Sequence, residues 1–537
     1  MTNQPIILEE PLLFVALNYV NKQLASPNGT GADRETLQLQ RASLMQWIRW
    51  MNDNYYDVPI TPVEEQAYYE PSAALEHFWI GYFYEKTHVP FNIVKQYNFE
   101  AFDPEAFRQA CRTLLERHEI LRTVAVFPDA SGKVKQKILP ALEVAAVIRE
   151  VDARGEEEKE KIASQHFTQA SNFIFDYAQG PLFYFTLLRF GAQHYRVIFN
   201  ISHAIFDEWS VGVFEQEFMA FYQRYATGAG PVPGAVPIQF KDYCAWERKL
   251  QRGTIGEKFR QYWFSQNRHK YPAQNLTTYF RNAPLADFSY RESLKRRIAP
   301  YLKSTDEKTL GRFYGVVAKA ERTTAKSFSF AVVGNTYGKV IELVKKMSCS
   351  TYYVLLAALA VTLSKITGAR EVVFGANAAL RDREEVKELI GFLVNTILIR
   401  VNVDGKKSLS NLVTDVIVSA ALASFHKQYT MSKLLDDQDI PFNAVNTVFL
   451  NMSLRNTGTV LTAAAGKHWD REGLGYFDLD LHITACQNGL ECWCNYNAAE
   501  YAKDQITLLF DRFIQVLDAC AGNPDGAIDR LIAGLHD

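Results

Sequence analysis

The segment best equipped for chemistry runs from residue 200 to residue 210, with the sequence NISHAIFDEWS. The residues before it predict a strand and those after it a helix, so His203 and Asp207 lie where a strand gives way to a helix. Such junctions expose side chains and backbone N–H groups, which makes them common places for sites. A histidine there can accept or donate a proton near neutral pH, and Asp207 can fix the loop by pairing with an arginine. The H-x-x-x-D pattern alone is a weak signal, because a lone histidine is more often a structural residue.

The elements that position this segment follow from apolar spacing. Leu182–Phe190 and His194–Ile201 are predicted strands, joined by a hairpin turn at Gly191–Gln193. The predicted helix after the segment has apolar residues at helical spacing from Val211 to Tyr225, with Ser210 as a plausible cap.

Beyond this hairpin, the chain alternates between strand and helix patterns in two similar-sized halves, so we predict an α/β fold. Further predicted helices are Leu12–Leu24, Glu35–Met51, Glu105–Glu116, Thr351–Ile366 and Asp504–Ala519; further predicted strands are Phe328–Val332, Glu371–Gly375, Asp478–Thr484 and Glu491–Asn497. The predicted units are an N-terminal helical extension (1–55), a first lobe with the H-x-x-x-D motif (56–267), a connector with an insertion (268–325) and a second lobe (326–537).

Composition narrows the classes of function. The chain has 537 residues, of which 48% are hydrophobic, and a formal net charge of -2, so it can bury several cores and has no basic excess for nucleic acid. A secretory leader and a run of about 18 apolar residues are both missing, so we expect a cytoplasmic protein outside the membrane. The seven cysteines lack metal-ligand spacing, so we expect no metal site. Cys492 and Cys494 alternate as in a strand, which favours a place in the core.

Six segments, in order, carry a recognisable set of motifs. They are RHEILRT (117–123), SHAIFDEWS (202–210), FKDYCAW (240–246), GANAALR (375–381), IGFLVNT (390–396, with Arg400) and DQDIPF (437–442). Together they resemble the condensation domains of nonribosomal peptide synthetases over roughly residues 56–537. Six motifs in the right order and spacing make a chance match very improbable.

The resemblance implies two lobes like chloramphenicol acetyltransferase, arranged as a V with a tunnel between them. His203 would be the catalytic residue midway along that tunnel, and Asp207 would pair with Arg381 in a structural role. The family pattern further implies supporting roles for Ser202, Trp209, Arg117 and Asn395, with Arg122 and Trp246 also structural. No cofactor of its own is implied, because the substrates ride on the phosphopantetheine of carrier proteins.

The activity implied by the resemblance is condensation by a free-standing monomer. A peptidyl or acyl carrier protein would present an acyl or aminoacyl thioester, and an amine, free or carrier-bound, would accept it to form an amide. Ester formation with a hydroxyl acceptor stays open. A non-catalytic platform that binds carrier proteins or tailoring enzymes also stays open. An acyl-CoA-dependent acyltransferase of the plant H-x-x-x-D type is disfavoured, since its D-F-G-W-G string is absent from this sequence.

Several positions depart from the family pattern. Ser202 replaces the first histidine of the motif, and Glu208 replaces its glycine. Glu208 is therefore a candidate residue of the acceptor side, where it could narrow the tunnel or contact a cationic amine. The opening family motif is matched only loosely, with Gln66 as its one candidate residue. The first 55 residues resemble docking segments, although a helical hairpin packed on a lobe explains them equally well.

Overall fold

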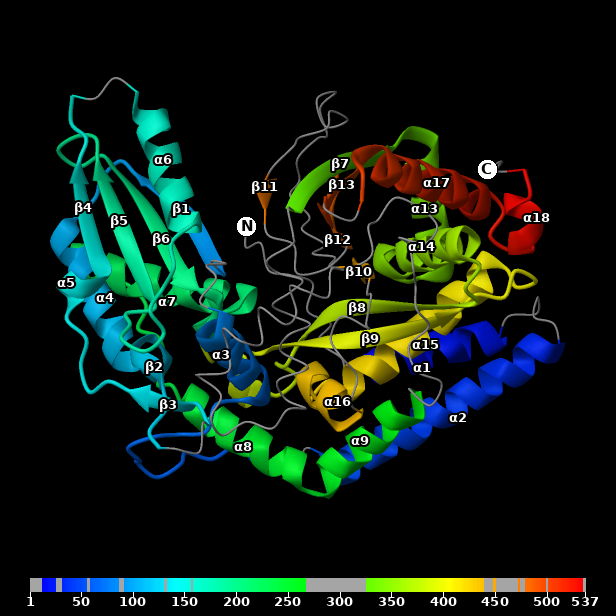
Figure 1. Ribbon diagram of the computed structural model, residues 1–537, viewed down its shortest axis with the longest axis horizontal. Coiled ribbons are helices and arrows are strands. Elements are labelled where there is room, and N and C mark those ends of the chain that lie inside the picture. Colours follow the sequence, from blue (N-terminus) through cyan, green and yellow to red (C-terminus); the bar gives the residue numbers. More distant parts are fainter. Residues whose placement is uncertain are drawn as a thin grey trace, which may run out of the picture.

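The fold is that of a computed structural model (Figure 1). It describes residues 12–25, 31–55, 58–85, 91–129, 133–155, 158–266, 325–438, 448–450, 472–473, 479–498 and 501–534. Most of the predicted connector (268–325) and residues 439–442 of the last motif lie outside these ranges.

The first lobe is built on a four-stranded sheet of order β1-β6-β5-β4. Strand β6 pairs antiparallel with β1 and β5, and β4 pairs parallel with β5. The predicted hairpin is confirmed as β5 and β6. In order, the elements of this lobe are α3 (Ala73–Glu85), β1 (Asn92–Phe99), α4 (Pro104–Arg117), η1 (Glu119–Arg122), β2 (Thr123–Val126), β3 (Lys135–Ile138), α5 (Val144–Val147), β4 (Ile148–Asp152), α6 (Lys159–Ser171), β5 (Phe183–Arg189), β6 (Tyr195–Ser202), η2 (His203–Ile205), α7 (Glu208–Thr227), α8 (Phe240–Arg252) and α9 (Thr254–Gln266).

The predicted cap of helix α7 is wrong. Asp207, not Ser210, is the N-cap residue, and its carboxylate accepts a hydrogen bond from the Ser210 N–H at 2.7 Å. Both residue types cap helices well, so local preference does not choose between them. Asp207 prevails because its extended backbone (ψ 173°) places its side chain over the first turn.

The second lobe contains a seven-stranded sheet of order β11-β7-β13-β12-β10-β8-β9. Its elements are β7 (Ala325–Val333), α13 (Gly334–Met347), α14 (Thr351–Thr367), β8 (Glu371–Ala379), η4 (Glu384–Val386), β9 (Val394–Asn402), α15 (Leu409–Phe425), α16 (Met431–Gln438), β10 (Val448–Leu450), β11 (Glu472–Gly473), β12 (Leu479–Cys486), β13 (Gly489–Asn497), α17 (Lys503–Gly522) and α18 (Ile528–Ile532). Each strand and helix predicted here is present, and β8 runs four residues further than expected.

The sheet of the second lobe has two unlike faces. Helices α13, α14 and α17 pack together on one face (Figure 1), and strand residues that point toward them are buried. Cys492 and Cys494 are among these and are 0% exposed, so the predicted core position of these thiols is confirmed. The residues of β12 and β13 between the buried ones, such as Asp480, His482 and Glu491, are mostly polar and at least partly exposed, and Trp493 lies on the same face.

The two predicted N-terminal helices are present as α1 (Leu12–Ala25) and α2 (Gly31–Asn54). They lie against helix α15 of the second lobe (Figure 1). Leu13, Ala16 and Val20 of α1 are at most 1% exposed, and Gln40 of α2 donates a hydrogen bond to Asp415 at 2.8 Å. This is the packed helical hairpin; a docking role for residues 1–55 stays a prediction.

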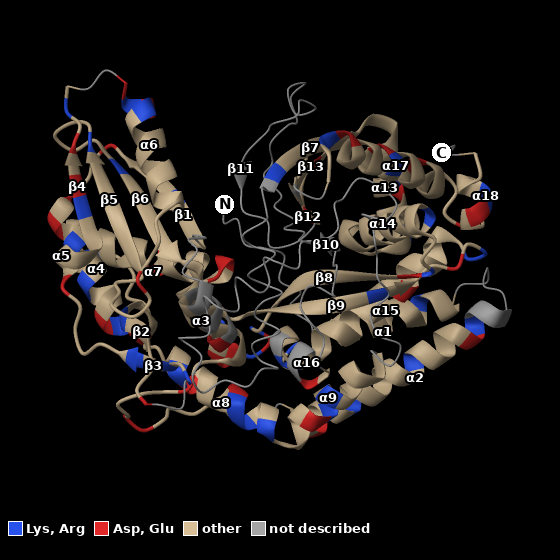
Figure 2. Ribbon diagram, in the orientation of Figure 1, with Lys and Arg blue, Asp and Glu red and all other residues tan. Residues whose placement is uncertain are grey.

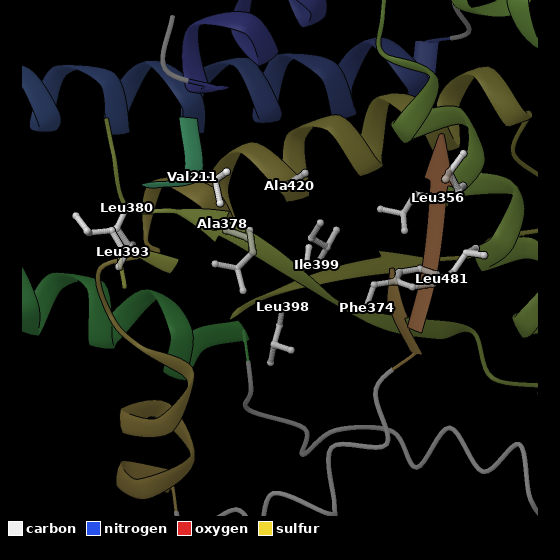
Figure 3. Close-up of a cluster of buried hydrophobic side chains, with 14 of the residues drawn as sticks. Val211, Leu356, Phe374, Ala378, Leu380, Leu393, Leu398, Ile399, Ala420 and Leu481 are labelled. Atoms are coloured by element: carbon white, nitrogen blue, oxygen red, sulfur yellow. The ribbon is translucent and has the colours of Figure 1, made fainter. Parts of the chain in front are cut away.

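One hydrophobic core runs through both lobes. Figure 3 shows Val211, from the start of α7 in the first lobe, in the same cluster of buried side chains as Leu380 and Leu393 of the second lobe. All three are at most 5% exposed, so the lobes are joined by packing at the first turn of α7. Charged residues lie mainly on outward helix faces and loops, with both signs mixed (Figure 2).

Among the described residues, no single helix is long and apolar enough to span a membrane. Helices α13 and α14 would meet that criterion only as a pair, and they are bent by 116° relative to each other.

Candidate active site at the junction of the lobes

His203 begins the short turn η2, directly after strand β6. Its backbone N–H donates to the Phe91 carbonyl at 2.7 Å, and its ring Nδ1 lies 2.7 Å from the Phe206 carbonyl oxygen. A carbonyl oxygen can only accept, so the neutral ring carries its proton on Nδ1. The lone pair then sits on Nε2, which has no hydrogen-bond partner in the part of the chain that the structure describes.

The His203 ring also touches the second lobe. Its centroid lies 5.5 Å from the Phe392 ring at an interplanar angle of 82°. The imidazole is partly exposed, while its neighbours Ala204 to Phe206 are fully buried. The structure therefore holds a base with a fixed ring on a rigid turn where the two lobes meet.

Asp207 and Arg381 form an ion pair across the lobe junction. Arg381 Nη2 lies 2.9 and 3.0 Å from the two carboxylate oxygens of Asp207, and each side chain is 1% exposed. Arg381 also donates from Nη1 to the carbonyls of Val386 and Leu389, at 2.8 and 2.6 Å. The pairing implied by the family resemblance is thus present in this chain.

Ser210 adds a second set of contacts to the same junction. Its hydroxyl donates to Asp207 at 2.7 Å and accepts from Arg381 Nη2 at 2.9 Å and from the Gly391 N–H at 3.1 Å. The Leu393 N–H donates to the other oxygen of Asp207 at 3.1 Å. We call Asp207, Ser210, Arg381, Gly391 and Leu393 the lobe latch.

The latch needs a glycine at position 391. A Cβ atom there would lie 2.2 Å from Cδ2 of Phe240, a fully buried ring of helix α8. This distance is far below van der Waals contact. The glycine of the sequence motif IGFLVNT is therefore explained by the close approach of α8.

Ser202 is buried beneath the site rather than part of it. Its hydroxyl lies 2.5 Å from the Tyr177 hydroxyl and accepts from the Ala204 N–H at 3.2 Å. Ser202 is 0% exposed. It fixes the start of the turn that carries His203, at the position where the family pattern has its first histidine.

The other expected supporting residues are held by their own lobes or by the junction. Trp209 donates from its indole to the Lys387 carbonyl at 2.7 Å, which adds a further contact between the lobes. Arg117 makes a paired contact with Glu217 of helix α7, with both N–O distances 2.9 Å. Asn395 donates to the Lys427 carbonyl at 2.6 Å. Arg117 and Asn395 therefore make their contacts within single lobes, away from the His203 ring contacts.

Two further motif residues also serve the scaffold. Arg122 donates from Nε to the Leu115 carbonyl at 2.7 Å, and the Trp246 indole donates to the Val58 carbonyl at 3.0 Å. Gln66 lies in the loop before α3, where its N–H donates to the Tyr69 hydroxyl at 2.9 Å.

Glu208 differs from the arrangement we expected for it. Its side chain is 53% exposed, and Oε1 lies 2.9 Å from Nζ of Lys95 on strand β1. The carboxylate charge therefore has a lysine partner, so a cationic acceptor is not needed to neutralise it. Beside this pair, the Tyr97 hydroxyl donates to Glu215 at 2.5 Å, and burial together with that carboxylate raises the pKa of Tyr97.

Sequence reasoning missed three contributors to the site. The carbonyl oxygens of Phe91 and Phe206 fix His203, and backbone carbonyls leave no signal in a sequence. Lys95 lies 113 residues from its partner Glu208 and belongs to no motif. Ser210 was expected only as a helix cap, whereas its hydroxyl contacts Asp207, Arg381 and Gly391.

Comparison with known proteins agrees with this architecture. The family model described as "Condensation domain" matches residues 94–315 and 316–533. Bacitracin synthase 1 of Bacillus licheniformis is 26% identical over 477 residues, which are 87% of this chain and 8% of that protein. Tyrocidine synthase 3 of Brevibacillus parabrevis is 25% identical over 479 residues, which are 88% of this chain and 7% of that protein. The chain spans about a tenth of the length of the curated relatives it matches.

Solved structures give the same fold. The first condensation domain of the calcium-dependent antibiotic synthetase, in complex with a substrate analogue, has a TM-score of 0.63 at 16% identity and covers 87% of this chain and 99% of that chain. The X-domain in complex with OxyB from teicoplanin biosynthesis has a TM-score of 0.67 at 18% identity, with 89% and 99% covered. The expected two-lobed, chloramphenicol acetyltransferase-like α/β fold is confirmed, whereas the tunnel stays a prediction.

Proposed function

Because the chain belongs to the condensation-domain family, we propose that it joins an acyl or aminoacyl group to an amine. The donor would be the phosphopantetheine thioester of a carrier protein, and the product would be an amide. The chain would then need no cofactor of its own. Family membership supplies the reaction class, and the His203 site supplies residues able to carry it out.

The observation that carries this proposal is the orientation of His203. Hydrogen bonding to the Phe206 carbonyl keeps the proton on Nδ1 and leaves Nε2 as the proton acceptor. The ring stands at the lobe junction, next to Phe392. A base that is fixed at one nitrogen and open at the other suits proton transfer from an attacking amine.

The proposed reaction does not need a strong base. An α-amine has an ordinary pKa of about 7.7–8.0, so a useful fraction is neutral near pH 7. The neutral amine would attack the thioester carbonyl, Nε2 of His203 would take the proton from the resulting ammonium, and the thiolate would leave and be protonated. Alignment of two tethered reactants can contribute roughly 7 kcal/mol in favourable cases. The lobe latch would supply that alignment by fixing the two lobes around His203.

The test is amide formation from loaded carrier proteins encoded beside this chain, followed by mass spectrometry of the products. His203→Ala should lose product formation with an unchanged melting temperature. His166→Ala, on helix α6 of the same lobe, is the matched control and should retain wild-type turnover. Equal turnover in His203→Ala and wild type would refute the catalytic role.

Ester formation remains the closest alternative. A hydroxyl acceptor has no neutral lone pair as nucleophilic as that of an amine, so its attack depends more on the base. Competition between matched amine and hydroxyl acceptors on the same donor separates the two outcomes. We expect amide as the dominant product.

A non-catalytic platform is the second alternative. It is motivated by Glu208, which replaces the family glycine. Under that alternative, wild type binds loaded carrier protein but yields no product with any acceptor. Activity that appears only in Glu208→Gly would support a blocked site. Activity in wild type would refute the platform.

A further inference from the structure

A group of polar residues lies on the sheet face of the second lobe that helices α13, α14 and α17 do not cover. Directly opposite residues of antiparallel strands share a face, and His482 of β12 lies opposite Trp493 of β13. Asp480 lies two residues before His482 on the same face, and Ser329 of β7 lies opposite Trp493. In Figure 1 this side of β12 and β13 faces away from those helices, toward the first lobe.

Three of these side chains, Asp480, His482 and Trp493, are in direct contact, and we call them the Trp493 cluster. The imidazole of His482 stacks on the indole of Trp493, with centroids 3.7 Å apart and planes 5° from parallel. Nε2 of His482 lies 2.8 Å from Oδ2 of Asp480. Since a carboxylate accepts, the histidine donates from Nε2, and the carboxylate holds the ring against the indole.

The cluster contains a hydrogen-bond acceptor that the described residues do not use. Oδ1 of Asp480 is buried and has no hydrogen-bond donor among the residues described here. Such unsatisfied oxygens are uncommon and call for an explanation. Glu491 faces the same side as Trp493, and the described residues of β7, β12 and β13 place no lysine or arginine on this face.

The cluster is also reachable from solvent. Trp493 is 37% exposed, and the Asp480 side chain is 22% exposed although its Oδ1 is buried. One face of the indole is covered by His482. An aromatic face beside a carboxylate, with no lysine or arginine on this face of the described strands β7, β12 and β13, is a combination that attracts an organic cation.

We propose that the Trp493 cluster binds a primary ammonium group of an amine-bearing ligand. The ammonium would contact the Asp480 carboxylate through a charge-assisted hydrogen bond and the Trp493 ring through a cation–π contact. Assignment of this ligand to a second positive charge on the acceptor substrate rests on the proposed function; the binding itself does not. The competing interpretation, a purely structural stack, entails no ligand.

The test uses fluorine NMR on the full chain labelled with 5-fluorotryptophan. The chain contains eight tryptophans, and the resonance missing from Trp493→Phe identifies residue 493. At pH 7, n-butylamine is an ammonium ion, and 1-butanol is its uncharged counterpart. We expect n-butylamine to shift the Trp493 resonance with saturation, and 1-butanol to leave it in place.

Variants then test whether the negative charge of Asp480 is needed for binding. Asp480→Asn keeps the side-chain shape and should weaken n-butylamine binding by about tenfold or more, a factor worth 1.4 kcal/mol. Asp511→Asn, an exposed aspartate on the outer helix α17, is the matched control and should bind as wild type does. Equal affinity in Asp480→Asn and wild type, or equal binding of 1-butanol, overturns the proposal.

A second measurement keeps the proposal testable if Asp480→Asn does not fold. Trp493→Leu changes a partly exposed residue, and calorimetric titration with n-butylamine should show lost binding; retained binding overturns the proposal. None of these titrations needs a carrier protein or turnover. Failure of the condensation assay would therefore leave the binding result intact, and the two proposals fail separately.

Discussion

Asp207→Ala should destabilise the protein strongly, because it leaves the Arg381 guanidinium buried without its counter-charge. Both side chains are 1% exposed, and removal of one partner from a buried ion pair costs about 3–5 kcal/mol. The change also deletes the N-cap of α7, worth about 1 kcal/mol, and the acceptor for the Leu393 N–H. These contributions share atoms and do not add fully, so we expect about 3–5 kcal/mol in total.

The assay is equilibrium unfolding in urea, followed by tryptophan fluorescence and by circular dichroism. Because the lobe latch joins the two lobes, the decrease in the free energy of unfolding should appear with both probes. Asp152→Ala breaks a comparably short pair with Arg154 in which both side chains are more than half exposed, so it should have far less effect. A loss below about 1 kcal/mol in Asp207→Ala, typical of an exposed pair, would refute the reasoning.

A double-mutant cycle sharpens this result. Arg381→Met removes the buried cation, so the double variant Asp207→Asn with Arg381→Met leaves neither charge unpaired. The loss of stability in the double variant should be smaller than the sum of the losses in the two single variants by about 0.5–3 kcal/mol. Strict additivity would show that the two side chains are not coupled.

Four further changes are predicted. Burial raises the pKa of Glu247 from 4.5 to about 7, so the folded state holds a proton that the unfolded state releases. The free energy of unfolding should therefore fall by about 3 kcal/mol as the pH rises from 4.5 through 7. Unfolding measured at pH 5 and pH 8 should show this fall in wild type and not in Glu247→Gln. Gly391→Ala drives a methyl group into Phe240 and should cost about 1–3 kcal/mol in urea unfolding, with recovery on adding Phe240→Leu; a stable single variant would contradict the close approach. Glu208→Gln should change stability by less than about 1 kcal/mol, and equal acceptor kinetics in this variant and wild type would exclude a charge role. Removal of residues 1–55 exposes the apolar surface of α15 and should produce aggregation on size-exclusion chromatography; a monodisperse, folded product would show that the hairpin is dispensable.

The sequence by itself predicted the elements well and singled out His203 as the candidate catalytic residue. Strong apolar periodicity marked the hairpin before His203 and the helices on either side of it, because period 2 and period 3.6 are properties of the local chain. Motif order and spacing indicated the family, and the family pattern paired Asp207 with Arg381. Without that resemblance, no rule of local sequence connects two residues 174 positions apart.

The tertiary structure determined the hydrogen-bond and ion-pair partners of those residues. The cap of α7 is Asp207 rather than Ser210, since the aspartate also receives Arg381 and Leu393 from the other lobe. The charge of Glu208 is paired by Lys95, which comes from a strand 113 residues earlier in the chain. The proton position on His203 depends on the Phe206 carbonyl, an atom that every residue type carries. Side-chain type determines which contacts are possible, whereas the packing of distant segments determines which of them form.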